Sequence, residues 1–344
     1  MRTKTFPILQ IILFALRSLI SNKFRFPVAQ ALVGGKEVNI ESQHSSNVEI
    51  SIFSTTDGFP YTRRSILKEE RCSGTIVNKN FILTAAHCFV KSSVHREDKS
   101  KEKAYRKSLI ERGRTLGYIS SIKVVIRKNT NREQEFTLEN NKINEDIFIH
   151  KKWFEPENER LDNGDWGDIA LLRLTEDIVD PNTVNLPFSQ RKSLDLTTVK
   201  AKVYGFGMTK AKSNSFGFKY GDFEVRGTNN FRRSAKRNFP FYYADRLWRN
   251  QDLLFAKGVK SRFGEKTQIC HGDSGGPLLV KKRSGWIQYG ITSLVDENCT
   301  EGFNVFLDIR RYVRWIKSVI KSKASSKDRI NGRRKNSHAR LLFK

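Results

Sequence analysis

Three short segments of the sequence carry residues whose types and spacing suit acyl transfer. The first, CHGDSGGP at 270–277, places Ser274 among glycines that let the backbone turn sharply. The amides of Gly272 and Ser274 can then point into one small pocket, so the segment offers a nucleophile and an oxyanion hole together. A glycine-rich turn that holds a serine by chance is the alternative, and the length of the string disfavours it.

A histidine and a carboxylate supply the other groups that such a nucleophile needs. His87 lies in the run LTAAHC, where small alanines leave room beside its ring, and an imidazole that is neutral near pH 7 suits a general base. Asp168 opens the apolar run DIALL, so we expect it at the edge of a core, accepting from the Nδ1–H of His87. Asp162 and Asp165 are rivals by proximity, but only Asp168 adjoins the apolar run.

The elements that must position these groups are short β-prone runs separated by polar turns. The runs cover 48–53, 75–84, 123–127, 169–174, 199–205, 277–280 and 285–294. This pattern favours an antiparallel all-β architecture over alternating strands and helices. The exception is Ile309 to Ile320, where apolar residues recur at helical spacing with basic residues on the other face, which predicts a terminal amphipathic helix.

Three polar stretches are expected outside the core. Lys91 to Lys107 is dense in charge, and Lys210 to Arg237 is rich in Asn, Ser, Gly, Phe and Arg, so both are predicted to be surface loops. The Phe residues of the second stretch form either a buried cluster or an exposed contact patch, and burial is favoured because exposed apolar patches are uncommon. Lys321 to Lys344 has little to bury, which predicts a mobile basic tail.

The chain is strongly basic, with 63 Lys and Arg against 36 Asp and Glu and a formal net charge of +27. Such a field attracts polyanions, and nucleic acid, anionic lipid, acidic glycans and cell-wall polymers all fit it. Charge alone does not choose between them, and a solubilising surface is the alternative. We expect a monomer whose basic surface and tail can contact polyanions, without specific recognition of nucleic acid.

The N-terminus resembles an export signal. Arg2 and Lys4 precede a largely apolar run from Phe6 to Leu16, which is too short to span a membrane. The small-x-small run at 29–31 suits a signal-peptidase cut before Leu32. An earlier cut followed by a short propeptide stays open, and an uncleaved anchor is less favoured. The mature protein is expected to be secreted, or periplasmic in a bacterium.

Four cysteines, Cys72, Cys88, Cys270 and Cys299, are compatible with two disulfides in an oxidising compartment. The sequence alone allows three pairings. Metal ligation is disfavoured because no Cys-x-x-Cys pair occurs and His87-Cys88 lacks a second ligand cluster. We therefore expect no metal and no cofactor. Cys88 can tie the loop that holds His87 back to Cys72.

The strings TAAHC, DIALL and GDSGGP, in the order His, Asp, Ser, resemble the chymotrypsin family of serine proteases. That order separates them from the subtilisins and the α/β-hydrolases. The resemblance covers roughly Leu32 to Ile320. It implies two six-stranded antiparallel Greek-key barrels with the active site in the cleft between them.

The same resemblance divides the chain. It implies a leader at 1–31, a first barrel at 32–185 with His87 and Asp168, a second barrel with the terminal helix at 186–320 with Ser274, and a tail at 321–344. The interval from His87 to Asp168 is longer than usual in the family, which implies an inserted loop, with Lys91 to Lys107 the favoured candidate.

Further roles follow from the resemblance alone. Leu32-Val33-Gly34-Gly35 resembles the family's mature N-terminus, whose α-amino group would pair with Asp273 and order the oxyanion hole. No Arg or Lys stands at Ala31, so a tryptic activation cut is not assumed. Gly205-Phe206-Gly207 resembles the family's Gly-Trp-Gly turn, and Ser293 resembles the serine that helps to hold the catalytic Asp. The disulfides implied are Cys72–Cys88 and Cys270–Cys299.

The positions that would contact substrate are also implied by the resemblance. Gln268 falls at the base of the specificity pocket, Val295 and Asn304 fall on its walls, and Leu294 replaces the usual Trp beside the substrate backbone. A neutral base disfavours Arg and Lys, and Thr292, where glutamate-cutting relatives have His, disfavours acidic residues. We expect cleavage after small or medium uncharged residues such as Ala, Val, Thr, Gln or Leu.

The sequence thus predicts a secreted serine endopeptidase that acts on proteins or peptides. The competing hypothesis is a catalytically silent protease fold that binds polyanions, since a fold does not guarantee its chemistry. Labelling of Ser274 by an organophosphonate would separate the two.

Overall fold

The computed structural model describes residues 32–38, 46–55, 67–89, 119–127, 130–139, 145–153, 167–187, 199–208, 216–226, 252–260, 266–294, 299 and 304–323. Several predictions lie outside the described residues. They concern the leader at 1–31, the loop at 91–107, the rival Asp162 and Asp165, the pocket residue Val295, and the tail from residue 324 onward.

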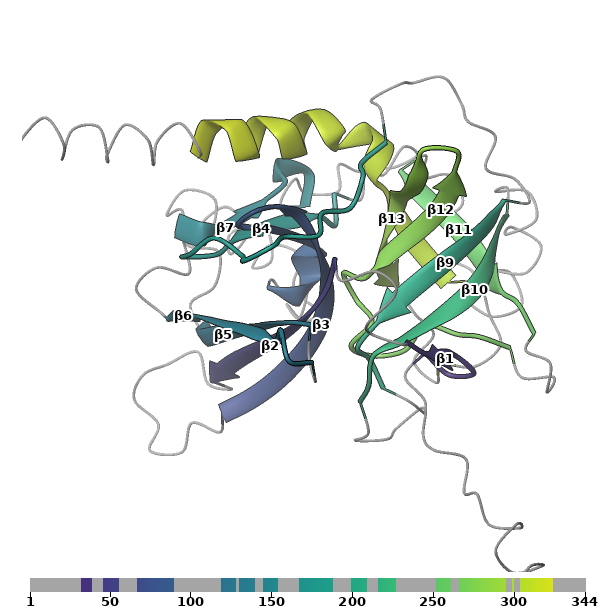
Figure 1. Ribbon diagram of the computed structural model, residues 1–344, viewed down its shortest axis with the longest axis horizontal. Helices are drawn as coiled ribbons and strands as arrows, with labels where there is room; N and C mark the ends of the chain where they lie inside the picture. Colours follow the sequence, from purple (N-terminus) through teal and green to yellow (C-terminus); the bar gives the residue numbers. More distant parts are fainter. Residues whose placement is uncertain are drawn as a thin grey trace, which may run out of the picture.

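The described strands form two antiparallel sheets, one in each half of the molecule (Figure 1). The first sheet has seven strands. In spatial order they are β6 (Gln134–Glu139), β5 (Ile119–Ile126), β2 (Asn47–Thr55), β3 (Leu67–Asn78), β4 (Phe81–Thr84), β8 (Ala170–Arg173) and β7 (Ile147–Ile149). Apolar side chains such as Val48, Ile50 and Ile52 recur at period two on β2 and are buried, because alternate residues of a strand face the same side.

The second sheet also has seven strands. In order they are β1 (Lys36–Glu37), β10 (Lys219–Arg226), β11 (Leu253–Gly258), β14 (Asn304–Asp308), β13 (Gly285–Leu294), β12 (Pro277–Lys282) and β9 (Lys200–Gly205). β9 pairs with β10 as well as with β12, so six of these strands close into a barrel and the short β1 extends it. In the first sheet no pairing between described residues joins its edge strands β6 and β7. The prediction of an all-β fold in two halves is confirmed.

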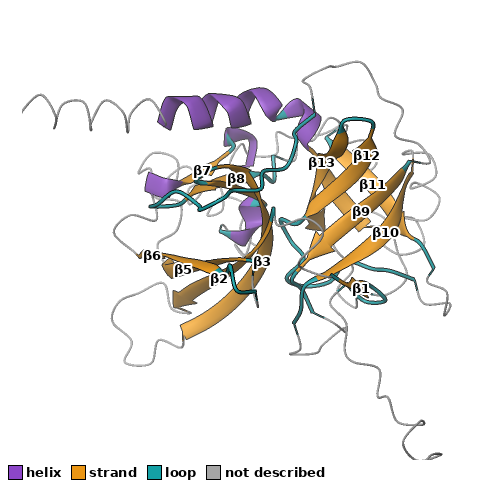
Figure 2. Cartoon of the chain, in the orientation of Figure 1, coloured by secondary structure: helices purple, strands orange, loops and turns teal. Residues whose placement is uncertain are grey.

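Helices are few and short in the described part of the chain (Figure 2). Three 3₁₀ turns occur, at Ala86–Cys88 (η1), Lys151–Trp153 (η2) and Ile309–Arg311 (η4). A helix at 313–323 follows η4, so the predicted helix begins later than Ile309 and runs past Ile320 into the predicted tail. No helix among these residues combines the length and the apolar character needed to cross a membrane.

The terminal helix packs on the first sheet although it follows the second barrel in sequence (Figure 1). Ile316 is fully buried in the same core cluster as residues of β2, β4 and β8. Trp315 meets the His150 ring edge-on with 5.2 Å between ring centroids. The helix therefore connects the second barrel to the first sheet, along the upper edge of the view in Figure 1.

The prediction that Lys210 to Arg237 is a surface loop is wrong for residues 219–226, which form β10. Burial alternates along this strand: Phe223 and Val225 face the barrel core while Glu224 and Arg226 face outward. The glycines and charges of this stretch concealed its period of two. Strands β1, β6, β7, β11 and β14 were also not predicted.

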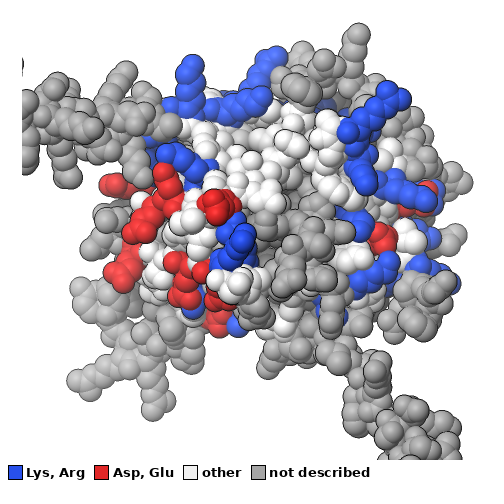
Figure 3. Space-filling view, in the orientation of Figure 1, with Lys and Arg blue, Asp and Glu red and all other residues white. Residues whose placement is uncertain are grey.

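Charge is unevenly distributed over the surface (Figure 3). On the face shown, basic side chains lie over the terminal helix and the second barrel, and acidic side chains gather over the first sheet. The exposed helix residues include Arg314, Lys317 and Lys321, and the exposed strand residues of β6 include Glu135 and Glu139.

Candidate active site

The nucleophile loop, residues 270–276, enters β12 of the second barrel and reaches the first sheet. Gly272 and Gly275 have φ values of +95° and +84°, a region that side chains rarely adopt. A Cβ at Gly275 would lie 2.1 Å from Thr84 Oγ1, so this glycine is also required by the close approach of the two halves. The Gly275 amide donates to Thr292 O at 2.9 Å, which fixes the loop against β13. Ser274 stands at the tip of this turn.

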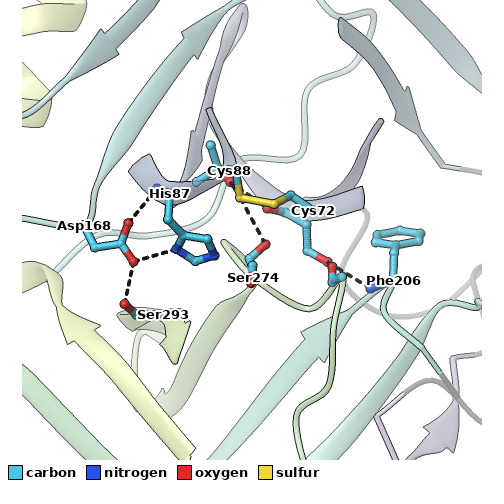
Figure 4. Close-up of a disulfide and its surroundings, with 10 residues drawn as sticks. Cys72, His87, Cys88, Asp168, Phe206, Ser274 and Ser293 are labelled. Carbon is cyan, nitrogen blue, oxygen red and sulfur yellow. Dashed lines mark hydrogen bonds and ion pairs between the residues drawn. A yellow bond between two sulfur atoms is a disulfide. The ribbon is translucent and has the colours of Figure 1, made fainter. Parts of the chain in front are cut away.

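His87 and Asp168 come from the first half and meet beside Ser274 (Figure 4). His87 lies in η1 directly after β4, and Asp168 precedes β8, the strand that pairs with β4. The His87 backbone amide donates to Asp168 Oδ1 at 2.9 Å, and His87 Nδ1 lies 2.8 Å from Asp168 Oδ2. Ser293, on β13, donates its hydroxyl to the same Oδ2 at 2.5 Å. Ser274 lies on the side of the imidazole away from Asp168.

The surroundings set the charges of this pair. Burial disfavours the charged imidazole and would lower the pKa of His87. The charge and hydrogen bond of the Asp168 carboxylate, with a smaller contribution from Glu70, outweigh burial, so the pKa of His87 is raised above its ordinary value. Burial opposes a charged Asp168 as well, yet the bonds from His87 and Ser293 hold the pKa of this carboxyl below its ordinary value. Asp168 is 1% exposed while the His87 side chain is 29% exposed, so a substrate can reach only the histidine.

Two backbone amides, those of Gly272 and Ser274, are the candidate oxyanion donors. Among the described residues, neither the Gly272 amide nor the Ser274 amide has a hydrogen-bond acceptor. The His271 carbonyl accepts from the Met208 amide at 2.7 Å, and since a trans peptide points its N–H opposite to its C=O, the Gly272 N–H faces away from Met208. Both amides are thus free to donate to a bound oxygen.

Asp273 is fully buried behind the nucleophile loop. Its carboxylate accepts from the amides of Gly207 and Cys270, each at 2.8 Å, and no described residue brings a cation to it. Burial raises the pKa of Asp273 to about 7, against the backbone bonds, which lower it. A Cβ at Gly205 or Gly207 would lie 2.1 or 2.6 Å from Asp273 Oδ1, so the Gly-Phe-Gly turn must carry glycines to admit this carboxylate.

The predicted N-terminal segment also lies against the second barrel. Leu32 is fully buried in the core of that barrel with φ of +50°. Val33 O accepts from the Gln268 amide at 2.9 Å, five residues before Asp273 in the chain. The segment at 32–33 thus lies beside the residues that precede Asp273 in the chain.

The predicted pocket residues are largely buried. Asn304 Oδ1 accepts from the Ile269 amide at 3.0 Å, and its Nδ2 donates to Ala256 O at 3.3 Å and to Gln268 Oε1 at 3.0 Å. These bonds fix the orientation of both amides, and the buried Gln268 Nε2 has no partner among the described residues. Leu294, partly buried, packs against the core next to Ser293.

Both predicted disulfides are present. Cys72 and Cys88 join β3 to η1, and Cys270 and Cys299 join the nucleophile loop to the segment after β13. The first bond closes a loop with a sequence separation of 16 residues, a size worth about 3 kcal/mol in the chain-entropy treatment. It holds the turn that presents His87.

One supporting group at the site carried no sequence signal. Tyr312, at the start of the terminal helix, accepts through its hydroxyl from the Gly167 amide at 3.3 Å, next to Asp168. The same hydroxyl donates to the fully buried Asp252 carboxylate at 2.9 Å, which also meets Arg311 Nε at 2.8 Å. These residues are distant in sequence, and only the fold brings them to the Asp168 turn.

A serine beside a carboxylate-bound imidazole, with two free amides next to it, is the arrangement that serine hydrolases use for acyl transfer. The chain belongs to the trypsin family, because the family model described as Trypsin matches residues 33–316. The resemblance seen in the sequence is confirmed.

Three curated relatives show how distant the similarity is. The chain is 26% identical over 281 residues to the CLIP domain-containing serine protease B4 of Anopheles gambiae, covering 77% of this chain and 68% of the relative. It is 25% identical over 298 residues to the urokinase-type plasminogen activator of Gallus gallus, covering 83% and 57%. It is also 25% identical over 298 residues to chymotrypsin-like elastase family member 1 of Homo sapiens, covering 85% and 93%.

Proposed function

We propose that this protein is an exported serine endopeptidase that hydrolyses peptide bonds through an acyl-enzyme. The observation that carries the proposal is the His87 ring between Ser274 and Asp168, with Nδ1 2.8 Å from the carboxylate. The relatives are themselves called a serine protease, a plasminogen activator and an elastase, which supports a protein or peptide substrate.

The proposed roles follow from the geometry. His87 takes the Ser274 hydroxyl proton as the oxygen bonds the scissile carbonyl carbon, and it returns this proton to the leaving amine when the C–N bond breaks. Asp168 stabilises the imidazolium between these transfers. The Gly272 and Ser274 amides hold the oxyanion. Water then attacks the ester as the second nucleophile, with His87 again accepting and returning the proton. The ester bond to Ser274 breaks and the free serine is restored.

Reaction with a fluorophosphonate probe tests the assembled site. An activated serine should react, and peptide mapping should find the label on Ser274 alone. A silent polyanion-binding scaffold predicts no labelling, because an ordinary serine hydroxyl is a poor nucleophile. Lack of labelling, combined with lack of turnover across a peptide library, would contradict the proposed function.

We propose that the enzyme cleaves after small or medium uncharged residues. The Gln268 oxygen already accepts from Asn304, whereas the Gln268 Nε2 has no partner among the described residues, so its N–H donors are the groups most available to a ligand. Lys and Arg side chains also carry only donors and would be buried without a counter-charge, at a cost of several kcal/mol. An acceptor such as a substrate Gln amide oxygen suits Gln268 better.

A panel of chromogenic peptides that vary only before the leaving group measures this preference. We expect kcat/KM for Ala, Val, Leu or Gln to exceed that for Arg by about 100-fold or more. The double variant Gln268→Asp with Asn304→Gly should raise the Arg rate, since it adds a carboxylate and removes the side chain bonded to position 268. A dominant Arg signal in the wild type would contradict the assignment.

We further propose that polyanions contact the basic surface, with the tail as the main element. The exposed Arg314, Lys317 and Lys321 of the terminal helix lead toward the basic sequence after residue 323. Truncation after Lys323 removes basic residues, so it should lower the salt concentration needed to elute the protein from heparin. Salt elutes such a protein because it screens the attraction between opposite charges. Hydrolysis of a small peptide should stay within about twofold. Unchanged elution would place the polyanion surface on the barrels instead.

A further inference from the structure

Ser73, on β3, lies between the two halves of the site, and its polar atoms are all hydrogen-bonded. Its hydroxyl donates to Gly272 O and accepts from the Phe206 amide, both at 2.9 Å. Its own amide donates to Ser274 O at 2.7 Å, and its carbonyl accepts from Thr84 Oγ1 at 2.8 Å. Ser73 is 1% exposed and follows Cys72 of the first disulfide (Figure 4).

These bonds affect the direction of one oxyanion donor, the N–H of Gly272. Gly272 stands between two peptide groups, and a different partner holds the carbonyl of each: Met208 N binds His271 O, and Ser73 Oγ binds Gly272 O. The Gly272 N–H lies in the 271–272 peptide, which Met208 holds, and Ser73 holds the neighbouring 272–273 peptide. With both planar groups held, neither torsion of Gly272 can rotate freely, so its N–H stays in place. Glycine lacks the Cβ that would otherwise limit these torsions.

We propose that Ser73 is a positioning residue for the oxyanion hole, holding the Gly272 carbonyl so that the Gly272 amide stays directed at the developing oxyanion. The inference rests on the proposed function and assigns Ser73 no contact with substrate. A hydrogen bond to an oxyanion strengthens as charge develops on the oxygen, so a misdirected donor costs more in the transition state than in the bound substrate.

The variant Ser73→Ala distinguishes a loss of transition-state stabilisation from a loss of substrate binding. We expect kcat to fall about tenfold with KM within about twofold, less than the roughly 100-fold that loss of a whole oxyanion donor costs. Affinity for a peptide boronate should fall by a similar factor, because its boron bonds Ser274 Oγ and the resulting negatively charged tetrahedral adduct presents a boronate hydroxyl oxygen to the hole. Affinity for an unreactive peptide with the same side chains should not change. Ser73→Thr, which keeps the hydroxyl, should restore most of kcat.

Thr84→Val is the matched control. It removes a buried hydroxyl bonded to Ser73 O and keeps the side-chain shape, but leaves the bond from Ser73 Oγ to Gly272 O. Both variants should lower the melting temperature, and only Ser73→Ala should lower kcat and boronate affinity. All kcat values are taken per site titrated with the phosphonate, so that a partly folded sample does not distort them.

Two outcomes overturn the inference: wild-type kcat and boronate affinity in Ser73→Ala, or an equal loss of both in Thr84→Val. Neither would affect the proposed function, which wild-type turnover and labelling of Ser274 test separately.

Discussion

Ser274→Ala and His87→Ala will each lower peptide hydrolysis by about 10⁴-fold or more while the protein stays folded. The groups act as a unit, so removal of either the nucleophile or its base removes most of the rate enhancement. Initial rates on the best peptide of the panel, with melting curves for each variant, give the comparison. Ser120→Ala is a suitable control, because this serine bonds Phe53 O on the first sheet and lies away from Ser274 in the chain.

The pH profile should report the same pair. His87 must be neutral to accept the Ser274 proton, and its raised pKa moves the acidic limb of kcat/KM to a higher pH than an ordinary histidine would give.

More than about a tenth of wild-type activity in purified Ser274→Ala would contradict the assignment of Ser274 as the nucleophile.

Asp273→Asn should lower kcat/KM of the processed enzyme by about 100- to 1,000-fold. We propose that a cut before Leu32 frees an α-ammonium group that pairs with the buried Asp273 and orders the adjacent Gly272 and Ser274 amides. Breaking a buried pair costs about 3–5 kcal/mol. N-terminal sequencing of the active form should read Leu-Val-Gly-Gly. Asp222→Asn, which removes a half-exposed acid paired with Lys36, should stay near wild type.

The uncut chain gives an independent measurement. Asp273 has a pKa of about 7 in this fold against 3.8 for an ordinary Asp, so between these values the folded chain binds more protons than the unfolded chain. The free energy of unfolding of uncut Ser274→Ala should therefore fall as the pH rises from about 4 to 7, and Asp273→Asn should reduce this fall. An active enzyme with another N-terminus, or full activity in Asp273→Asn, would contradict the proposed maturation.

Residues that act through their immediate neighbours could be predicted from the sequence. Each of these residues meets a local requirement. The glycines around Ser274 allow a left-handed backbone torsion. The Asp at the start of an apolar strand supplies a buried carboxylate, and the His precedes a cysteine whose disulfide holds its turn. The order of these segments was enough to indicate the family. Apolar runs also revealed strands such as β2, because their periodicity is local.

Strands with mixed surfaces could not be predicted in the same way. β10 carries charges on outward positions such as Asp222 and Glu224, and its buried face includes Lys219 and Gly221, which break the apolar alternation. Only the pairing with β9 and β11 shows that Phe223 and Val225 face a core. The sequence indicates side-chain chemistry but not which distant backbone groups will need a partner.

Tertiary structure alone decided the contacts that join the two halves. Ser73 is separated from Gly272 by 199 positions, and Tyr312 from Gly167 by 145, yet each pair is hydrogen-bonded beside the triad. The orientation of Gln268 likewise depends on Asn304, 36 residues away. Hydrogen bonds of this kind are set by where whole sheets and loops pack, so the sequence determined which groups could do the chemistry, and the packing of the two halves determined how they are aimed.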